Sequence, residues 1–296
     1  MSSISPSFQR TRARRFREML FRSAAMASLV FVVGPAAWLV IGVIVRAVPH
    51  WQWSVLTTVS QGTSGGLENA IVGTLVIMFG VLVIAGTIGV LAGIHFAELA
   101  RPRRNGKPSG AILRTATEVL SGFPSIVLGY VGYVALCVGL HWGFSLLPAL
   151  LILSLMVVPY IAKATESAIR QVPTNYREGA EALGMSSGYM LRRIVLKSAL
   201  PGIVTGVLIA LSIAGGETAP LLYTAGVSNN LPSMSLIHQP IGYLTYYVWT
   251  DYNQPMNSAH YVSYDAALIL IVLVLVLLIT TRIIVARTQR HAEGNR

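Results

Sequence analysis

Charged side chains are scarce in this chain, at 11% of its 296 residues. A soluble domain carries about 25%. The deficit, together with 54% hydrophobic residues and a mean hydropathy of +0.64, excludes an ordinary soluble protein and indicates one that faces lipid. The charges present are unbalanced, with 22 Lys and Arg against 11 Asp and Glu. They lie between apolar runs, so we interpret them as determinants of membrane orientation rather than as a nucleic-acid surface.

Cysteine is almost absent as well. Cys137 is the single one and lies inside an apolar run, so a disulfide framework is excluded and no metal site is predicted. No Gly-x4-Gly-Lys-Ser/Thr loop occurs, so the chain is not expected to bind ATP through a P-loop. The letters Gly184-Met185-Ser186-Ser187-Gly188 match a hydrolase elbow, but a predicted helix precedes them where that elbow needs a strand. A membrane enzyme is therefore the weakest interpretation.

Six uncharged runs approach or exceed the length of about 20 residues that crosses the hydrocarbon core of a bilayer. They are residues 24–45, 69–94, 119–140, 142–162, 198–216 and 266–281. Little more than His141 separates the third run from the fourth, so we expect a tight helical hairpin there. The predicted fold is all-α: a six-helix transmembrane domain over 24–288, preceded by a basic segment, 1–23, and followed by a tail, 289–296.

The basic residues predict the topology of these six spans. Only Arg46 lies in the gaps on one side of the membrane, and every other Lys and Arg lies on the opposite side. Because cytoplasmic loops carry the excess of positive charge, both termini and the loop 163–197 are predicted to be cytoplasmic. The loop 217–264 is predicted to be external.

Small residues and one charge pair predict how the spans pack. Glycine lets helix backbones approach closely. The candidate contact residues are Gly86, Gly89 and Gly93 in the second span and Gly202 and Gly206 in the fifth. Arg114 and Glu118 are four residues apart near the start of the third span, a spacing that favours an ion pair on one helix face.

The cytoplasmic loop is predicted to contain a short helix. Asn175 and Glu178 have the spacing of a capping box, and Gly184 is placed to end the helix. Small residues on one face would leave room for another protein surface, whereas the plainer alternative is an ordinary amphipathic surface helix. This face contains Gly179, Ala180 and Leu183.

The same stretch resembles the EAA loop of ABC-importer permeases, in which Glu178-Gly179-Ala180 is followed after three residues by Gly184. Ile194 and Leu196 also fit that pattern, whereas Lys197 stands where proline is usual. The resemblance implies a type I importer permease fold and a coupling helix that docks on a separate ATPase subunit. The residues that it assigns to coupling are Glu178, Gly179, Ala180, Leu183 and Gly184.

Two further segments resemble the phosphate-importer permeases of the PstA type. They are Ala-Gly-Gly-Glu-Thr-Ala-Pro-Leu-Leu-Tyr-Thr at 214–224 and Ser-Gly-Phe-Pro-Ser-Ile-Val-Leu-Gly at 121–129. The resemblance implies import of inorganic phosphate across a bacterial plasma (inner) membrane. The candidate residues of the translocation pathway are Glu217, Thr218, Ser212 and Arg114. The related permeases carry an Arg near Ser212, so the positive charge for an anion would come from Arg114 or from a partner subunit.

The residues around Glu217 favour a break in the fifth span. Gly215, Gly216 and Pro220 would interrupt the helix and release backbone N–H groups for an anion. Glu217 would accept a hydrogen bond from a phosphate O–H or neutralise a partner's arginine. Its plainer interpretation is a charge that ends the span at the outer interface.

The resemblance also implies the partners: PstB-like ATPase subunits that bind the ATP, a PstC-like second permease, and a PstS-like extracytoplasmic phosphate-binding protein. It implies no cofactor for this chain and no catalytic residue. Two alternatives remain open from the sequence. One is an importer for another oxyanion, such as sulfate or molybdate, and the other is a membrane scaffold that signals phosphate status without carrying substrate.

Overall fold

The computed structural model describes residues 12–99, 111–233 and 235–293, and in these ranges every extended regular element is a helix. Residues 1–11 of the predicted basic segment and 294–296 of the predicted tail lie outside them. The chain divides into two units, Met1–His50 and Trp51–Arg296, which are described separately. In the first unit, α1 (Arg12–Ala47) contains the predicted first span and has the length and hydropathy of a membrane span.

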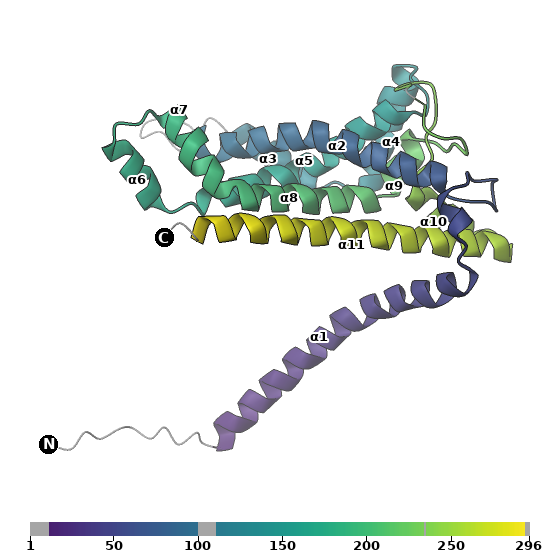
Figure 1. Ribbon diagram of the computed structural model, residues 1–296, viewed down its shortest axis with the longest axis horizontal. Coiled ribbons are helices and arrows are strands. Elements are labelled where there is room, and N and C mark those ends of the chain that lie inside the picture. The colour runs from purple at the N-terminus through teal and green to yellow at the C-terminus, as the bar shows by residue number, and fades with distance from the viewer. Residues whose placement is uncertain (1–11, 100–110, 234, 294–296) are drawn as a thin grey trace. The chain divides into compact units, whose positions relative to one another are not determined.

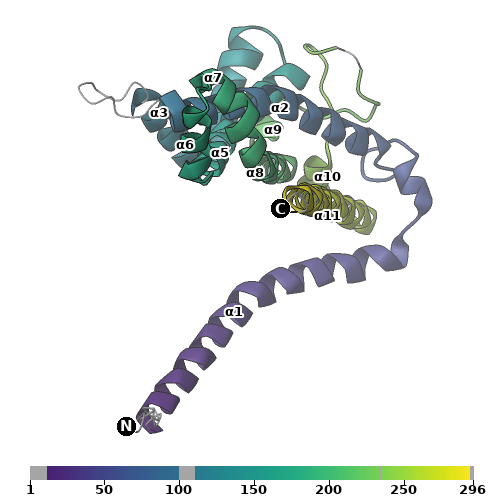
Figure 2. The same cartoon turned by 60° about the vertical axis from the view of Figure 1, so that its left-hand side comes forward.

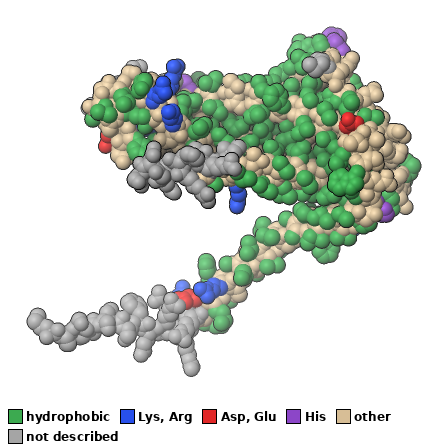
Figure 3. All heavy atoms as spheres, in the orientation of Figure 1, with side chains coloured by type: hydrophobic (Ala, Val, Ile, Leu, Met, Phe, Trp, Pro, Cys, Tyr) green, Lys and Arg blue, Asp and Glu red, His purple; other side chains and the backbone are tan. Residues whose placement is uncertain are grey.

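The second unit is built on long helices that lie side by side (Figures 1 and 2). These are α2 (Glu68–Ile94), α5 (Leu146–Arg170), α8 (Leu196–Gly216) and α11 (Asn257–Glu293). Hydrophobic side chains cover the broad face shown in Figure 3. One group of Lys and Arg lies toward the end that carries the short helices α6 (Thr174–Ala182) and α7 (Ser187–Met190), and a further basic side chain projects from the lower edge. This distribution is that of a membrane-embedded bundle.

The third predicted span is not a single straight helix. It consists of α3 (Ala111–Gly122) and of α4 (Ser125–Gly132), which continues into the π-helical turn η4 (Tyr133–Gly139), and the two parts meet at 103°. Pro124 explains the break, because proline donates no N–H and disfavours helical backbone in the residue before it. The predicted span 119–140 therefore corresponds to the end of α3, α4 and η4, with a break that was not predicted from the sequence. Within the described residues, five helices are long and apolar enough to span a membrane, or six if this bent pair is one span.

Close contacts between helices confirm most of the predicted packing residues. A Cβ atom added to Gly89 of α2 would lie 2.6 Å from the Cβ of Ile161 in α5, and one added to Gly202 of α8 would lie 2.8 Å from the Cβ of Ala168. Gly86 is buried, but the nearest atom to its added Cβ belongs to its own helix. Cross-helix contact is thus confirmed at Gly89, Gly93, Gly202 and Gly206.

Hydrogen bonds attach a cap, made of loops and the short helix α10 (Leu244–Tyr252), to the start of α2. The side-chain amide of Asn69, fully buried, donates to the Tyr247 hydroxyl (2.9 Å) and to the Ser228 carbonyl oxygen (2.8 Å). The Thr74 hydroxyl accepts from the Leu244 backbone N–H (2.9 Å). Because buried polar groups are costly unless paired, these bonds fix the cap on α2.

Candidate functional site

The fifth predicted span is interrupted where the sequence predicts. α8 ends at Gly216 and α9 (Ala219–Thr224) begins after two linking residues, with Glu217 in extended conformation and proline in the first turn of α9. The N–H of Glu217 still donates to the Ala214 carbonyl oxygen (3.3 Å). Its own carbonyl oxygen accepts from the Thr245 hydroxyl (2.9 Å). The interruption thus carries a half-buried carboxylate and is tied to the start of α10.

The two interrupted helices meet at this point. The side chain of Ser125, the first residue of α4, lies beside the Glu217 carboxylate. α4 and α9 then run in close contact, since a Cβ added to Gly129 would lie 2.7 Å from the Cα of Pro220. The segments 121–129 and 214–224, treated separately in the sequence, therefore form one structural site. Interrupted helices that meet in this way are typical of transport sites in membrane proteins.

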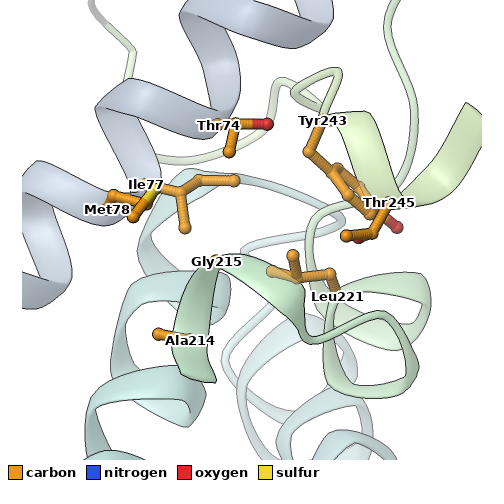
Figure 4. A pocket seen from close by; sticks show the side chains of 8 residues that line it. All are labelled: Thr74, Ile77, Met78, Ala214, Gly215, Leu221, Tyr243 and Thr245. Atoms are coloured by element: carbon orange, nitrogen blue, oxygen red, sulfur yellow. The ribbon is translucent and has the colours of Figure 1, made fainter. Parts of the chain in front are cut away.

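A small cavity lies behind the interruption (Figure 4). It has about 10 Å³ of room for the centre of a water molecule, close to the lower limit for holding one water. Side chains from α2, α8, α9 and the start of α10 surround it. The lining residues are Thr74, Ile77, Met78, Ala214, Gly215, Leu221, Tyr243 and Thr245.

Tyr243 is the functional candidate that sequence reasoning missed. Its side chain is 1% exposed, and its hydroxyl has no hydrogen-bond partner among the described residues. Burial raises the pKa of Tyr243 well above its ordinary value, so the hydroxyl keeps its proton and remains a donor. The only sequence signal near it is the tyrosine-rich stretch 243–247, a composition that is typical of a membrane interface rather than of a cavity.

The other two pathway candidates lie differently. The Ser212 hydroxyl donates to the Leu208 carbonyl oxygen (2.9 Å) within α8, one turn before the interruption. Arg114 is near the start of α3, while Ser125 and Glu217 meet beyond its other end. The Arg114 guanidinium pairs with Glu166 of α5 (2.6 Å) instead of the predicted Glu118. The structure therefore does not bring Arg114 to the interruption.

The predicted coupling helix is α6. It ends in a Schellman motif. The Met185 N–H donates to the Ala180 backbone carbonyl oxygen (3.1 Å), the Gly184 N–H donates to the Glu181 backbone carbonyl oxygen (2.9 Å), and Gly184 has φ +71°. This confirms the predicted stop. The predicted capping box is wrong: α6 begins at Thr174 after an extended Pro173, and no side chain caps it.

The surface of α6 is almost entirely open. Ala180 is buried, whereas Glu178, Gly179, Gly184 and, at 77% exposure, Leu183 face outward. Four of the five predicted coupling residues are thus available to a partner, and the fifth holds the helix in place. α7 begins directly after Ser186, which is in extended conformation.

A helical bundle with membrane-length apolar helices, two interrupted helices and a short exposed helix between α5 and α8 has the architecture expected of a permease. Residues 86–290 match the family described as binding-protein-dependent transport system inner membrane component, and the chain belongs to this family. It is a transport component of an ABC importer, not an enzyme, and members work with an ATPase and a substrate-binding protein.

Individual relatives show which members of this family the chain is similar to. The chain is 57% identical over 271 residues, 92% of its length and 88% of the relative, to the phosphate transport system permease protein PstA 2 of Mycobacterium bovis. It is 31% identical to the phosphate transport system permease protein PstA of Haemophilus influenzae, covering 91% of this chain and 94% of the relative. Among solved structures, an inward-facing form of the MetNI methionine ABC transporter matches with a TM-score of 0.54 and 22% identity, covering 86% of this chain and 98% of that chain. That structure supports the predicted permease fold.

Proposed function

We propose that this chain imports inorganic phosphate. Support comes from relatives named as phosphate permeases and from the site where Ser125 and Glu217 meet. The meeting of these two residues is the observation that carries the proposal, because it places a carboxylate and a hydroxyl together between two interrupted helices.

The chemistry of the site suits phosphate more than sulfate. At neutral pH phosphate keeps a proton and sulfate does not, so only phosphate donates a hydrogen bond to the Glu217 carboxylate. Sulfate meets the same carboxylate as an uncompensated like charge, which is discrimination by repulsion. The Thr218 hydroxyl would donate to one of the remaining phosphate oxygens. Because Arg114 is engaged with Glu166, we assign the compensating positive charge to the second permease.

The partners follow the same proposal. α6 would dock on PstB-like ATPase subunits through Glu178, Gly179 and Leu183, and a PstC-like permease would complete the pathway. A PstS-like protein would deliver phosphate to the loops between Glu217 and α11. In this arrangement both termini are cytoplasmic, and ATP binding drives alternating access.

Uptake of radiolabelled phosphate tests the proposal in cells that lack their own high-affinity system. The operon is supplied with the chain intact, deleted, or carrying Glu217→Gln, and Glu118→Gln serves as the matched control because that carboxylate is exposed. We expect uptake to require the chain, to resist excess sulfate and molybdate, and to fall by about tenfold or more in Glu217→Gln, the loss expected for a hydrogen bond to a charged group.

Three outcomes would contradict the proposal. Uptake that survives deletion of the chain would refute it outright. Inhibition by excess sulfate or molybdate would indicate another oxyanion. Altered phosphate-responsive gene expression without any flux through the assembled complex would indicate a signalling scaffold.

A further inference from the structure

An ion pair joins α6 to the end of α2. The Arg177 guanidinium of α6 contacts both carboxylate oxygens of Glu98, with Nη2 to Oε1 at 2.7 Å and Nη1 to Oε2 at 3.1 Å. The two side chains are only 12% and 15% exposed. A bidentate, mostly buried arginine–carboxylate pair has a specific geometry and is screened by salt much less than a surface pair. It therefore connects α6 to the end of α2 in one defined arrangement.

Arg177 supplies the polar part of the attachment of α6. Arg177 and Ala180 are three residues apart and thus share one helix face. Ala180 packs in an apolar cluster with Ala97, which precedes Glu98, and with Ile169 of α5. The other α6 side chains are exposed. The apolar contact of Ala180 and the ion pair of Arg177 thus hold the inward face of the helix. The exposed side chains on its other faces are available to a partner.

Glu98 belongs to a π-helical turn, η3 (His95–Leu99), that continues α2. Arg170 and Arg114 also contact this turn. The Arg170 guanidinium donates to the Phe96 carbonyl oxygen (3.4 Å), and the Arg114 guanidinium lies 5.7 Å from the centre of the Phe96 ring. The same two arginines share the Glu166 carboxylate, at 2.6 and 2.9 Å. Since π-helical turns inside helices frequently occur at functional sites, this clamped turn is a candidate for transmitting movement.

α2 carries the connection to the site around Glu217. Residues Glu68–Glu98 form one apolar helical span. At its far end, Thr74 accepts from the Leu244 N–H, and the next residue of α10, Thr245, donates to the Glu217 carbonyl oxygen. A movement of α6 that shifts Glu98 would thus displace α2 and, through α10, the interrupted helix at Glu217.

We infer that Glu98 and Arg177 are positioning residues that couple α6 to α2, so that docking of the ATPase moves the whole span. Neither residue touches substrate. The inference rests on the chain being an importer permease and does not depend on phosphate as the substrate.

The test uses the complete transporter in proteoliposomes. The readout is ATP hydrolysis stimulated by the substrate-binding protein, isolated with whatever ligand it carries from the cells. The variants are Arg177→Ala, Glu98→Gln and the exchange Arg177→Glu with Glu98→Arg. Arg282→Ala is the matched control, because Arg282 is exposed and lies in α11 outside the link. Co-purification with the ATPase reports assembly.

We expect each single variant to lose stimulation by about tenfold, the loss of one hydrogen-bonded charge pair, while the subunits still co-purify. The charge exchange should restore most of the stimulation of ATP hydrolysis. It would not do so if either residue were needed only for its own shape. Normal stimulation in Arg177→Ala would overturn the inference. So would an exchange that recovers nothing, or single variants whose subunits no longer co-purify, since the pair would then serve assembly. Stimulated hydrolysis by the wild type without phosphate uptake would contradict the proposed function alone.

Discussion

Gly73 of α2 and Gly242, two residues before α10, touch backbone to backbone. A Cβ atom on Gly73 would collide with the carbonyl oxygen of Gly242, and backbone atoms cannot yield as a flexible side chain does. This contact lets Thr74 reach Leu244. We expect Gly73→Ala to lower the free energy of unfolding by about 1–3 kcal/mol, the cost of overpacking. Thermal unfolding in detergent measures it. Gly86→Ala on the same helix meets only an ordinary contact and should change little.

Gly184 has left-handed backbone with open space around it. Gly184→Ala should cost about 1–2 kcal/mol of stability, because a Cβ is disfavoured there, and Gly184→Asn should cost less. Gly184→Trp should abolish uptake, since the indole would occupy the surface that α6 offers to the ATPase. Thermal unfolding and substrate uptake are compared across the three variants. If Gly184→Trp transports normally, α6 does not dock through this end.

Gly179 lies in the middle of α6, exposed, with nothing within 4 Å of an added Cβ. Gly179→Ala should therefore stabilise the helix by up to about 1 kcal/mol, the difference in helix propensity between the two residues. Uptake and ATPase stimulation should be retained. A loss of either, with normal thermal unfolding, would mean that the partner surface needs the space left by glycine.

Asp251 gives a pH dependence with a definite sign. Burial raises the pKa of Asp251 from 3.8 to about 6, and the residue lies in α10, outside the spans. The folded chain therefore binds this proton more tightly than the unfolded chain, so Asp251 lowers stability as pH rises from about 4 to 6 and has a constant effect above that. Asp251→Asn should have a higher unfolding temperature than the wild type at pH 7.5. The difference between the two unfolding temperatures should be smaller at pH 4.

The matched control for this titration is Glu118→Gln, because the Glu118 carboxylate is exposed. Its unfolding temperature should follow that of the wild type at every pH. An unfolding temperature for Asp251→Asn that is parallel to the wild type across the whole range would show that Asp251 does not titrate in this interval.

Local patterns predicted much of the fold because their physical causes are local. A run of apolar residues must form a helix in lipid, so α1, α2, α5, α8 and α11 follow from the sequence. The break after Gly216 follows equally from two glycines and a nearby proline. Pro124 is the same kind of signal for the break before α4. This break was not predicted from the sequence, because the uncharged run 119–140 is long enough for one continuous span.

Contacts between distant segments could not be predicted in this way. Spacing along one helix suggested Glu118 as the partner of Arg114, whereas packing of α3 on α5 brings Glu166 closer. Nothing local indicated that Ser125 would meet Glu217 or that Glu98 would meet Arg177. These pairs depend on how whole helices pack, and a single sequence does not encode that packing in any short pattern.

The isolation of Cys137 has a practical value. Its side chain is 5% exposed in η4, where the thiol faces the backbone carbonyls of Tyr223 and Thr224. Maleimide reagents react with accessible thiolates, so the native chain should stay unlabelled in its folded state. Cysteines introduced at exposed positions of α6 and α10 would then be the sole targets for paired fluorophores. Distances across the bilayer could be followed during turnover in an otherwise unaltered protein.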